Sequence, residues 1–453
     1  MKNILGLLVL LTSCLFSRAQ VYQEYLLSDW AFKAESDKYW LPAQVPGILI
    51  DDLLDNGKSS VNSSDSIWFY RTTFIADKQI MSRDFVELSF EGLDTRATVF
   101  LNQKPILAAN NMFRSWSVPI KSLIKEGENE LMIRFANVEY SPSLRKAYYH
   151  FKDADPILPL GVWKPVILES WNEYRLDHLS YRITEITDKE ARLTAELDFR
   201  TQGEQQVNVE VYDEVSGRTF TRETVRVAPG SEQIELPFVI KKPKLWWPKK
   251  LGKPNLYKIA VRVNSGKNEQ VMMKRIGIRD VKVDPSSTVQ DFRLMVNGKS
   301  VHVDLSEYWP MAMNASSIST DEYDSFFFIL ERLEKTVLHI ASPGIYESPY
   351  FYDLADTHGI LILQDFMFPP ANYPKTASFL ENVKAEAAEN IKALQHHPSV
   401  VAWGGVVPKY SDKEGAHSGT EEDSNAKAHS EHINALLKKT LEEIDPTYFF
   451  LAK

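Results

Sequence analysis

Four acidic side chains in the last third of the chain could carry acid–base chemistry. Asp304, Glu307, Glu347 and Asp365 each stand at or just after a short apolar run of strand length. Where parallel strands alternate with helices, active-site groups gather at the ends of strands and the starts of loops. Carboxyl groups in that position are candidates for general acids or for substrate ligands. Trp403, at the end of another apolar run, is a further candidate for substrate contact.

Metal and cofactor chemistry has little support in the sequence. His, Asp and Glu residues show no metal-ligand spacing, and no glycine-rich phosphate loop is present. His396 and His397 adjoin Pro398 at a predicted helix end, which favours capping of the helix dipole over metal binding. Cys14 is the only cysteine and lies in the leader, so the mature fold has neither a disulfide nor a thiolate metal site. We therefore expect no metal and no cofactor.

Residues 336–403 must position the candidate side chains. Apolar runs at 337–341, 360–363 and 400–403 alternate with helical patterns at 350–357 and 378–396. Continuous apolar strands separated by helices indicate parallel strands that are buried on both faces. The sequence therefore predicts successive β/α units.

Further units are predicted on both sides of this segment. We expect residues 301–305 to form the first parallel strand and 448–452 the fifth, with helices at 321–335 and 429–444. The polar residues 411–429 are predicted to form a long loop. A closed (β/α)8 barrel has eight strands, so the prediction is a partial TIM barrel of about five strands.

The first 284 residues have a different pattern. Short alternating or apolar strands between Gly, Asn and Pro punctuation predict a jelly-roll β-sandwich and then a smaller, immunoglobulin-like β-sandwich. The predicted division is residues 1–19 as a signal peptide, 20–172 as a jelly-roll, sugar-binding-like domain, 173–284 as the immunoglobulin-like sandwich, and 285–453 as the partial barrel.

Composition excludes several kinds of partner. The 453 residues are 44% hydrophobic and 25% charged, as in ordinary globular proteins. The net charge of -9 argues against nucleic acid or an anionic membrane surface as a partner. No run after the leader approaches the roughly 18 apolar residues of a membrane span.

The amino terminus predicts export. Lys2 provides the positive start, residues 4–11 the apolar core, and residues 17–19 a small-x-small cleavage site before Gln20. Residues 11–14 also fit a lipoprotein box, which would leave a lipidated Cys14 as the alternative. Export without disulfides suggests a bacterial periplasm or cell surface.

Several motifs, in this order, resemble glycoside hydrolase family 2 and its β-mannosidase branch. The motifs are VPG at 45–47, WFYR at 68–71, GLDTRATVFLN at 92–102, NMF at 111–113, GVWKPV at 161–166, LWWP at 245–248, GIYESPYFYDLADTHGILILQDFMF at 344–368 and HHPSVVAW at 396–403. The resemblance covers essentially the whole mature chain. It implies the same domain order and a glycosidase that acts on O-glycosyl bonds, and it assigns Glu347 and Asp365 to loop positions that this family carries.

The resemblance also implies that the catalytic residues are lost. The family's acid/base glutamate falls on Pro408 and the asparagines before it on Val406 and Val407. Its Arg-x-Trp after the second strand becomes His339-Ile340-Ala341, and its tryptophan-containing mannose loop becomes KDADP at 152–156. The family nucleophile follows the seventh strand, which we expect to lie outside these residues. We therefore expect no catalytic residue here, and keep Asp304, Glu307, Glu347, Asp365 and Trp403 as substrate-binding candidates.

Three functional readings follow. The first is an exported β-mannosidase-like protein of carbohydrate metabolism, a pseudoenzyme that is inactive on its own. The alternatives are an active β-mannosidase or related exo-glycosidase that removes terminal β-D-mannose, and the front fragment of a split gene. The expected partners are a β-mannoside-type glycan and either a second copy or a second chain that completes the barrel.

Overall fold

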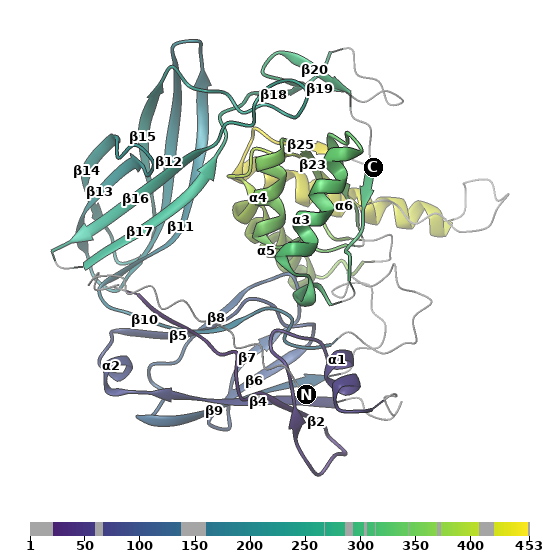
Figure 1. Cartoon of the computed structure of the whole chain (residues 1–453). Helices are drawn as coiled ribbons and strands as arrows, with labels where there is room; N and C mark the ends of the chain where they lie inside the picture. The colour runs from purple at the N-terminus through teal and green to yellow at the C-terminus, as the bar shows by residue number, and fades with distance from the viewer. Residues whose placement is uncertain are drawn as a thin grey trace, which may run out of the picture.

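The structure is a computed structural model in which two β-sandwiches precede an α/β segment (Figure 1). It describes residues 21–58, 67–136, 160–266, 268–285, 293–302, 306–312, 314–342, 344–368, 373–406 and 421–451, without the side chains of 302 and 421–429. The predicted fold class is confirmed, because the two sandwiches are followed by parallel strands that alternate with helices. The described parallel strands form one five-stranded sheet, so closure into a barrel stays a prediction.

The first sandwich packs a six-stranded sheet on a four-stranded one. In spatial order, the larger sheet contains β3 (Leu41–Pro42), β2 (Ala31–Ala34), β4 (Ile67–Ala76), β9 (Gly127–Ala136), β6 (Ala97–Leu101) and β7 (Lys104–Ala109), and the smaller contains β1 (Tyr22–Tyr25), β10 (Val166–Trp171), β5 (Phe85–Phe90) and β8 (Trp116–Pro119). Two short helices, α1 (Leu49–Asp55) and α2 (Lys78–Met81), accompany them. In β4 alternate residues such as Trp68, Tyr70 and Phe74 are buried, because successive strand side chains point to opposite faces.

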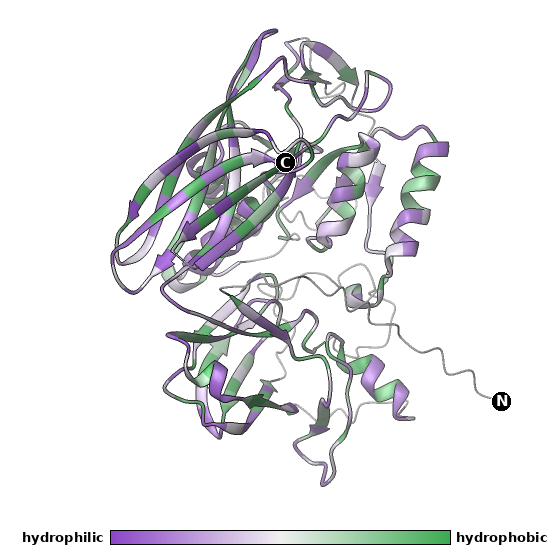
Figure 2. Ribbon diagram, turned by 60° about the vertical axis from the view of Figure 1, so that its left-hand side comes forward, coloured by the Kyte–Doolittle hydropathy of each residue, from purple (hydrophilic) through white to green (hydrophobic). Residues whose placement is uncertain are grey.

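The second sandwich has a three-stranded and a four-stranded sheet. These contain β11 (Tyr174–Ile186), β12 (Glu190–Thr201) and β15 (Gly230–Lys241), and then β14 (Thr219–Val227), β13 (Gln205–Asp213), β16 (Tyr257–Ser265) and β17 (Asn268–Ile276). Val207, Val209 and Val211 of β13 lie in its core, with polar residues between them. Figure 2 shows this alternation as bands of opposite hydropathy along the strands.

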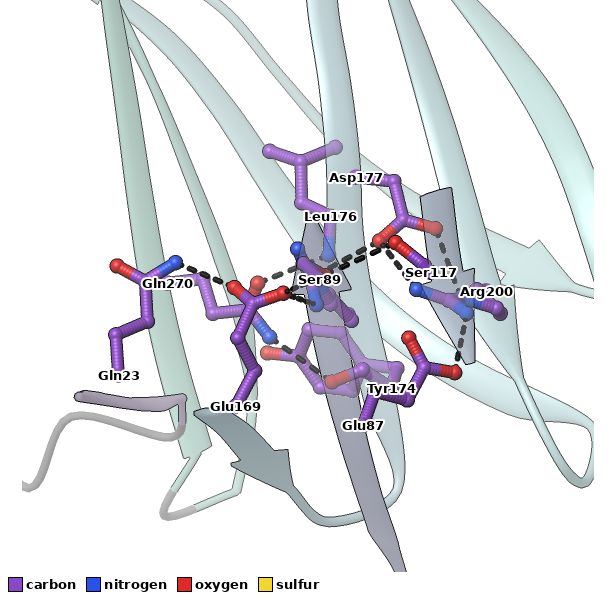
Figure 3. Close-up of polar contacts among 11 residues, drawn as sticks. Gln23, Glu87, Ser89, Ser117, Glu169, Tyr174, Leu176, Asp177, Arg200 and Gln270 are labelled. Carbon is purple, nitrogen blue, oxygen red and sulfur yellow. Dashed lines mark hydrogen bonds and ion pairs between the residues drawn. The ribbon is translucent and has the colours of Figure 1, made fainter. Parts of the chain in front are cut away.

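Polar side chains join the two sandwiches (Figure 3). Glu169 on β10 accepts hydrogen bonds from Gln23, Ser89 and Arg175, at 2.6, 2.9 and 2.9 Å. Arg200 on β12 donates to Glu87 on β5 at 2.6 Å. Because Glu87 and Glu169 are buried, these contacts also satisfy charges that would otherwise be costly to bury.

The α/β segment forms a parallel sheet with helices on one face. Its strands, adjacent in chain order, are β21 (Ser306–Tyr308), β22 (Val337–Ile340), β23 (Leu361–Asp365), β24 (Val400–Gly404) and β25 (Phe449–Leu451). Its helices are α3 (Thr320–Arg332), α4 (Pro349–His358), α5 (Ala377–Leu394) and α6 (Glu421–Ile444), with a short 3-10 turn η2 (Ala315–Ser317) before α3. A capping box between Ser319 and Glu322 begins α3, and Gly359, with φ 67°, ends α4.

The two faces of this sheet have separate apolar cores. Leu338, Ile340 and Ile362 pack toward the helices. On the other face Val337 and Leu361 pack in a cluster that includes the buried Trp246, which comes from the connection between β15 and β16 of the second sandwich. The alternation of strand side chains therefore decides whether a given residue points toward the helices or toward the opposite face of the sheet, which we call the interior face.

The prediction for the first parallel strand was wrong. Residues 299–302 form β20 (Lys299–His302), which pairs antiparallel with β19 (Arg293–Val296), and β19 pairs with β18 (Val281–Val283). The turn between β19 and β20 is Asn297-Gly298, with φ values of 49° and 78°. Asn-Gly with two positive φ values is a typical hairpin turn, and this local preference decided the pairing. The first parallel strand is β21, and the predicted boundary at Asp284 lies between the paired strands β18 and β19.

The predicted loop 411–429 was also wrong in its second half. Helix α6 begins at Glu421, eight residues before the predicted start at 429, and residues 411–420 lie outside the described residues. The sequence EEDSNAKAH contains Glu, Ala and Lys, which have high helix propensity and extend the helix in spite of their polarity. Within the described part of the chain, no helix is long and apolar enough to cross a membrane.

Candidate functional site

In folds with alternating parallel strands and helices, active-site residues lie at the carboxyl ends of the strands, here β21 to β25. Glu307 on β21 lies beside His339 on β22, and Asp365 at the end of β23 lies beside Gly404 on β24. His339 in turn lies beside Leu363, two residues before Asp365 on the same strand. The structure therefore brings together two predicted residues, Glu307 and Asp365, with a histidine between them. Asp304 lies outside the described residues.

Asp365 is fully engaged by the protein. Its Oδ1 is 3.0 Å from His339 Nε2, and its Oδ2 accepts a hydrogen bond of 3.0 Å from the backbone N–H of Ser342. The side chain is 1% exposed. Asp365 therefore orients His339 and holds the loop that follows β22. From the sequence, His339 stood out only as a replacement of a family residue, because its contact with Asp365 depends on strand register that the sequence does not reveal.

Glu307 differs from Asp365 in exposure. It is an exposed residue on a three-residue strand at the edge of the sheet. Of the four predicted carboxyl groups, it is the only one in the described residues that solvent reaches freely. Among the described candidates, Glu307 is therefore the acid that a ligand at this end of the sheet can reach.

Glu347 lies on the helix-covered side, away from Glu307 and Asp365. Its carboxylate accepts hydrogen bonds from Tyr308 and Tyr323 at 3.0 and 2.6 Å, and its backbone N–H donates to the Tyr352 hydroxyl at 3.3 Å. Burial raises the pKa of Glu347 to about 7, although the tyrosine hydrogen bonds act in the opposite direction. The geometry thus favours a role in joining β21, α3 and α4.

The end of β24 is closed and apolar. Trp403 is fully buried, and its ring stacks on Phe366 with centroids 4.6 Å apart. Val406 is also fully buried. Its backbone N–H donates to Asn434 Oδ1 of α6 at 2.6 Å, and its carbonyl accepts from Asn434 Nδ2 at 3.1 Å. Neither Trp403 nor Val406 is therefore placed to contact a substrate.

Close packing at Gly405 strengthens this conclusion. A Cβ atom there would lie 2.3 Å from Asn434 Oδ1 and 2.7 Å from the Phe450 ring, so only glycine fits. Val407, Pro408 and the KDADP loop at 152–156 lie outside the described residues. Helix α6 and β25 therefore cover the chain as far as it is described after β24.

The first sandwich meets the α/β segment through the NMF motif. Asn111 Nδ2 donates to the buried Glu386 of α5 at 2.8 Å, and Arg114 pairs with Glu389 at 3.0 Å. The Phe113 ring meets the Tyr346 ring edge-on, with centroids 5.2 Å apart. The motif thus serves domain docking.

One cluster has the geometry of a metal site, but its ligand atoms are occupied. Asp353, Asp356 and His397 offer atoms within 4.8 Å of one another. Asp356 is bonded to His397 Nδ1 at 2.6 Å and to the Ser399 N–H at 3.0 Å, and Asp353 pairs with Arg275 at 2.9 Å. The His397 side chain therefore binds a buried aspartate, and the helix-cap interpretation of this residue was wrong.

Comparisons with known proteins agree with this architecture. Residues 30–156 match the family described as glycosyl hydrolase 2 galactose-binding domain-like. Residues 175–279 match the family described as glycosyl hydrolases family 2. β-Mannosidase B of Thermothelomyces thermophilus is 32% identical over 408 residues, which are 83% of this chain and 47% of that protein. β-Mannosidase B of Aspergillus clavatus is 29% identical over 452 residues, or 86% of this chain and 51% of that protein.

Solved structures show the same relationship. A β-D-mannosidase from Dictyoglomus thermophilum superposes with a TM-score of 0.82 at 28% identity, covering 95% of this chain and 57% of that one. A β-glucuronidase from Bacteroides uniformis, at 14% identity and a TM-score of 0.76, shares the fold. The chain belongs to glycoside hydrolase family 2 and is β-mannosidase-like. It spans about half the length of the curated relatives it matches.

Proposed function

We propose that this chain is an exported β-mannosidase-like protein of carbohydrate metabolism that does not hydrolyse β-mannosides by itself. The observation that carries the proposal is the end of β24. There Val406 is buried with its backbone bound to Asn434, and the family resemblance assigns the acid/base position to Pro408. Proline has no ionisable group, so it can neither give nor accept a proton.

The surviving acids support the same proposal. Retaining glycosidases need two carboxyl groups about 5 Å apart that flank the scissile bond. Asp365 is bound by His339 and Ser342, and Glu347 lies on the other face of the sheet among tyrosines. Of the described candidates, Glu307 alone is both exposed and on the interior face.

An aryl mannoside assay tests this proposal. We expect purified chain to release no 4-nitrophenol from 4-nitrophenyl β-D-mannopyranoside above the buffer rate. Glu307→Gln and Asp365→Asn variants serve as controls, because a contaminating hydrolase would be equally active in all three preparations. Turnover by the wild-type chain that either substitution abolishes would contradict the proposal.

The names of the relatives and the half-length match favour a second candidate function. In this function the chain combines with further β/α units, encoded downstream or carried by a second chain, and the complete protein removes terminal β-D-mannose. The coding sequence after Lys453 discriminates between the two. A following frame with glutamates in the family's catalytic positions favours the second candidate, whereas unrelated sequence favours the first.

The export proposal rests on residues 1–19 and has its own test. Expressed in a bacterium with its leader, the protein should reach the periplasmic fraction with Gln20 as its first residue. A lipidated Cys14 in the membrane fraction would support the lipoprotein alternative. Unprocessed protein in the cytoplasm would refute both.

We also propose self-association through β25. Among the described residues this strand pairs only with β24, so its other edge can pair with a second copy or a second chain. Light scattering at micromolar concentration should give more than the monomer mass. A monodisperse monomer would contradict this proposal.

A further inference from the structure

A cavity of about 640 Å³ lies between the second sandwich and the sheet ends opposite the candidate functional site. Residues 181–188, of β11 and the turn after it, line one side. Residues 395–398 and Tyr448, which lead into β24 and β25, line the other. The cavity therefore lies at the amino ends of the parallel strands, and domain interfaces of this kind are common places for ligand pockets.

The half-buried Arg279 side chain forms part of its wall. Arg279 Nε donates to the Pro398 carbonyl at 2.5 Å, and its Nη2 donates to the Val400 carbonyl at 2.6 Å. A guanidinium has five N–H donors, so these two bonds leave others available. Arg279 forms no ion pair with a carboxylate in the described part of the chain, and burial lowers its pKa. Arg279 is therefore held by backbone carbonyls rather than by a paired carboxylate, beside the cavity.

Three further lining groups lack partners. The Tyr448 hydroxyl, Gln395 Oε1 and His396 Nδ1 are buried, and none forms a hydrogen bond with another described residue. Buried polar groups in native proteins are usually paired, so three such groups around one cavity need an explanation. A hydroxyl both donates and accepts, an amide oxygen accepts, and a guanidinium donates. The lining residues therefore include both hydrogen-bond donors and acceptors.

The charges around the cavity favour an uncharged ligand. Of its other cations, Arg182 pairs with Glu196 at 2.7 Å and Lys282 with Asp280 at 2.7 Å. The buried Asp445 accepts from the Thr447 N–H at 2.9 Å. Acidic and basic side chains thus offset one another, and Arg279 is balanced by its proximity to Asp445 and Asp280. An ionic ligand would meet groups of its own sign.

We propose that this cavity binds an uncharged, polyhydroxylated small molecule of the size of a mono- or disaccharide. The ligand hydroxyls would bond Arg279 and Tyr448 on the side of the parallel sheet. This site goes beyond the proposed function, because it shares no residue with the carboxyl ends of the strands and requires no catalysis.

Calorimetric titration of the full chain tests the proposal, with methyl β-D-mannopyranoside and β-1,4-mannobiose as neutral probes and glucuronate as the charged one. We expect saturable binding of a neutral probe. Tyr448→Phe should weaken it about tenfold, the equivalent of one lost hydrogen bond. The matched control is Tyr181→Phe, because Tyr181 lines the same cavity and its hydroxyl is already bonded to the Ile259 carbonyl at 3.1 Å. Tyr181→Phe should leave the affinity unchanged.

A second pair of variants covers the case in which Tyr448→Phe misfolds. Thr184 is exposed at the cavity, so Thr184→Trp should block binding, whereas Thr224→Trp on β14, outside the cavity, should not. Glu307→Gln, at the other end of the sheet, should also bind normally. The proposal would be overturned if neither neutral probe bound saturably, or if glucuronate alone bound. It would also be overturned if binding survived Thr184→Trp but was lost in Glu307→Gln.

Discussion

The carboxyl group of Glu347 lies between two tyrosine hydroxyls on the helix-covered face of the parallel sheet, 5% exposed. Asp365, 18 positions further along the chain, faces the interior and binds His339. Both residues follow short apolar strands, and both carry the same functional group. Their roles differ because the loop after β22 turns one toward the helices, while strand alternation turns the other inward.

Stability should depend on pH through Glu347. Its folded-state pKa of about 7 lies above the unfolded value near 4.5. The folded state therefore binds more protons than the unfolded state between these values, and stability falls as the pH rises through this window. We expect the wild type to lose about 3 kcal/mol relative to Glu347→Gln between about pH 5 and 8, because glutamine stays neutral.

Urea denaturation of both proteins across this range measures the difference. Glu126→Gln is the matched control, since Glu126 is exposed on the first sandwich. Its difference from wild type should not vary with pH. Parallel stability curves for wild type and Glu347→Gln would show that the carboxyl group is ionised equally in both states.

Periodicity and turn chemistry account for which elements could be predicted. The alternation in β13 and the continuous apolar runs of β22, β23 and β24 led to the right strands. Residues 301–305 were wrongly predicted as a parallel strand, because an apolar run does not distinguish a parallel strand from one strand of a hairpin. The Asn297-Gly298 turn was the available signal for that hairpin.

The candidate site was less predictable than the elements. Sequence placed Glu307, Glu347 and Asp365 near strand ends, but it could not give the face toward which each side chain points. It also could not show that His339 binds Asp365, or that Asn434 covers the end of β24. Both contacts join elements whose pairing exists only in the folded chain.

At the scale of elements, the docking of α5 on the first sandwich should depend on Asn111. Asn111→Ala would leave the fully buried Glu386 without its 2.8 Å hydrogen bond. A hydrogen bond to a charged group contributes about 1.5–3 kcal/mol, so the melting temperature should fall. Asn208→Ala removes an exposed asparagine that bonds Asn264 and Thr224, and it should change stability by less than about 0.5 kcal/mol. Equal effects of the two substitutions would contradict the docking role.

At the scale of the whole molecule, the two sandwiches have cores separate from those of the parallel sheet. Each has both of its sheets within residues 21–276. The sandwiches meet through Glu169, Arg200 and their partners, as Figure 3 shows. The first 279 residues therefore contain what two folded sandwiches need, without the hairpin strands β18 and β19.

A fragment of residues 21–279 should accordingly fold. We expect a soluble protein with a cooperative thermal transition, because each sandwich buries its own apolar core. A fragment that ends at Asp284 is the control, since it leaves β18 without β19 and should be less soluble. A non-cooperative melt of the shorter fragment would mean that the sandwiches depend on the α/β segment.

The most direct test of the central claim is hydrolysis of an unactivated substrate, β-1,4-mannobiose, by the purified chain from about pH 4 to 9. General acid–base catalysis typically contributes about 10²–10⁴-fold, and an unactivated leaving group depends on it most. We propose that Pro408 stands in the acid/base position, and mannose release should then stay at the buffer rate at every pH. The Dictyoglomus thermophilum β-D-mannosidase provides the positive control. Saturable release by this chain, with a bell-shaped pH profile, would contradict the account.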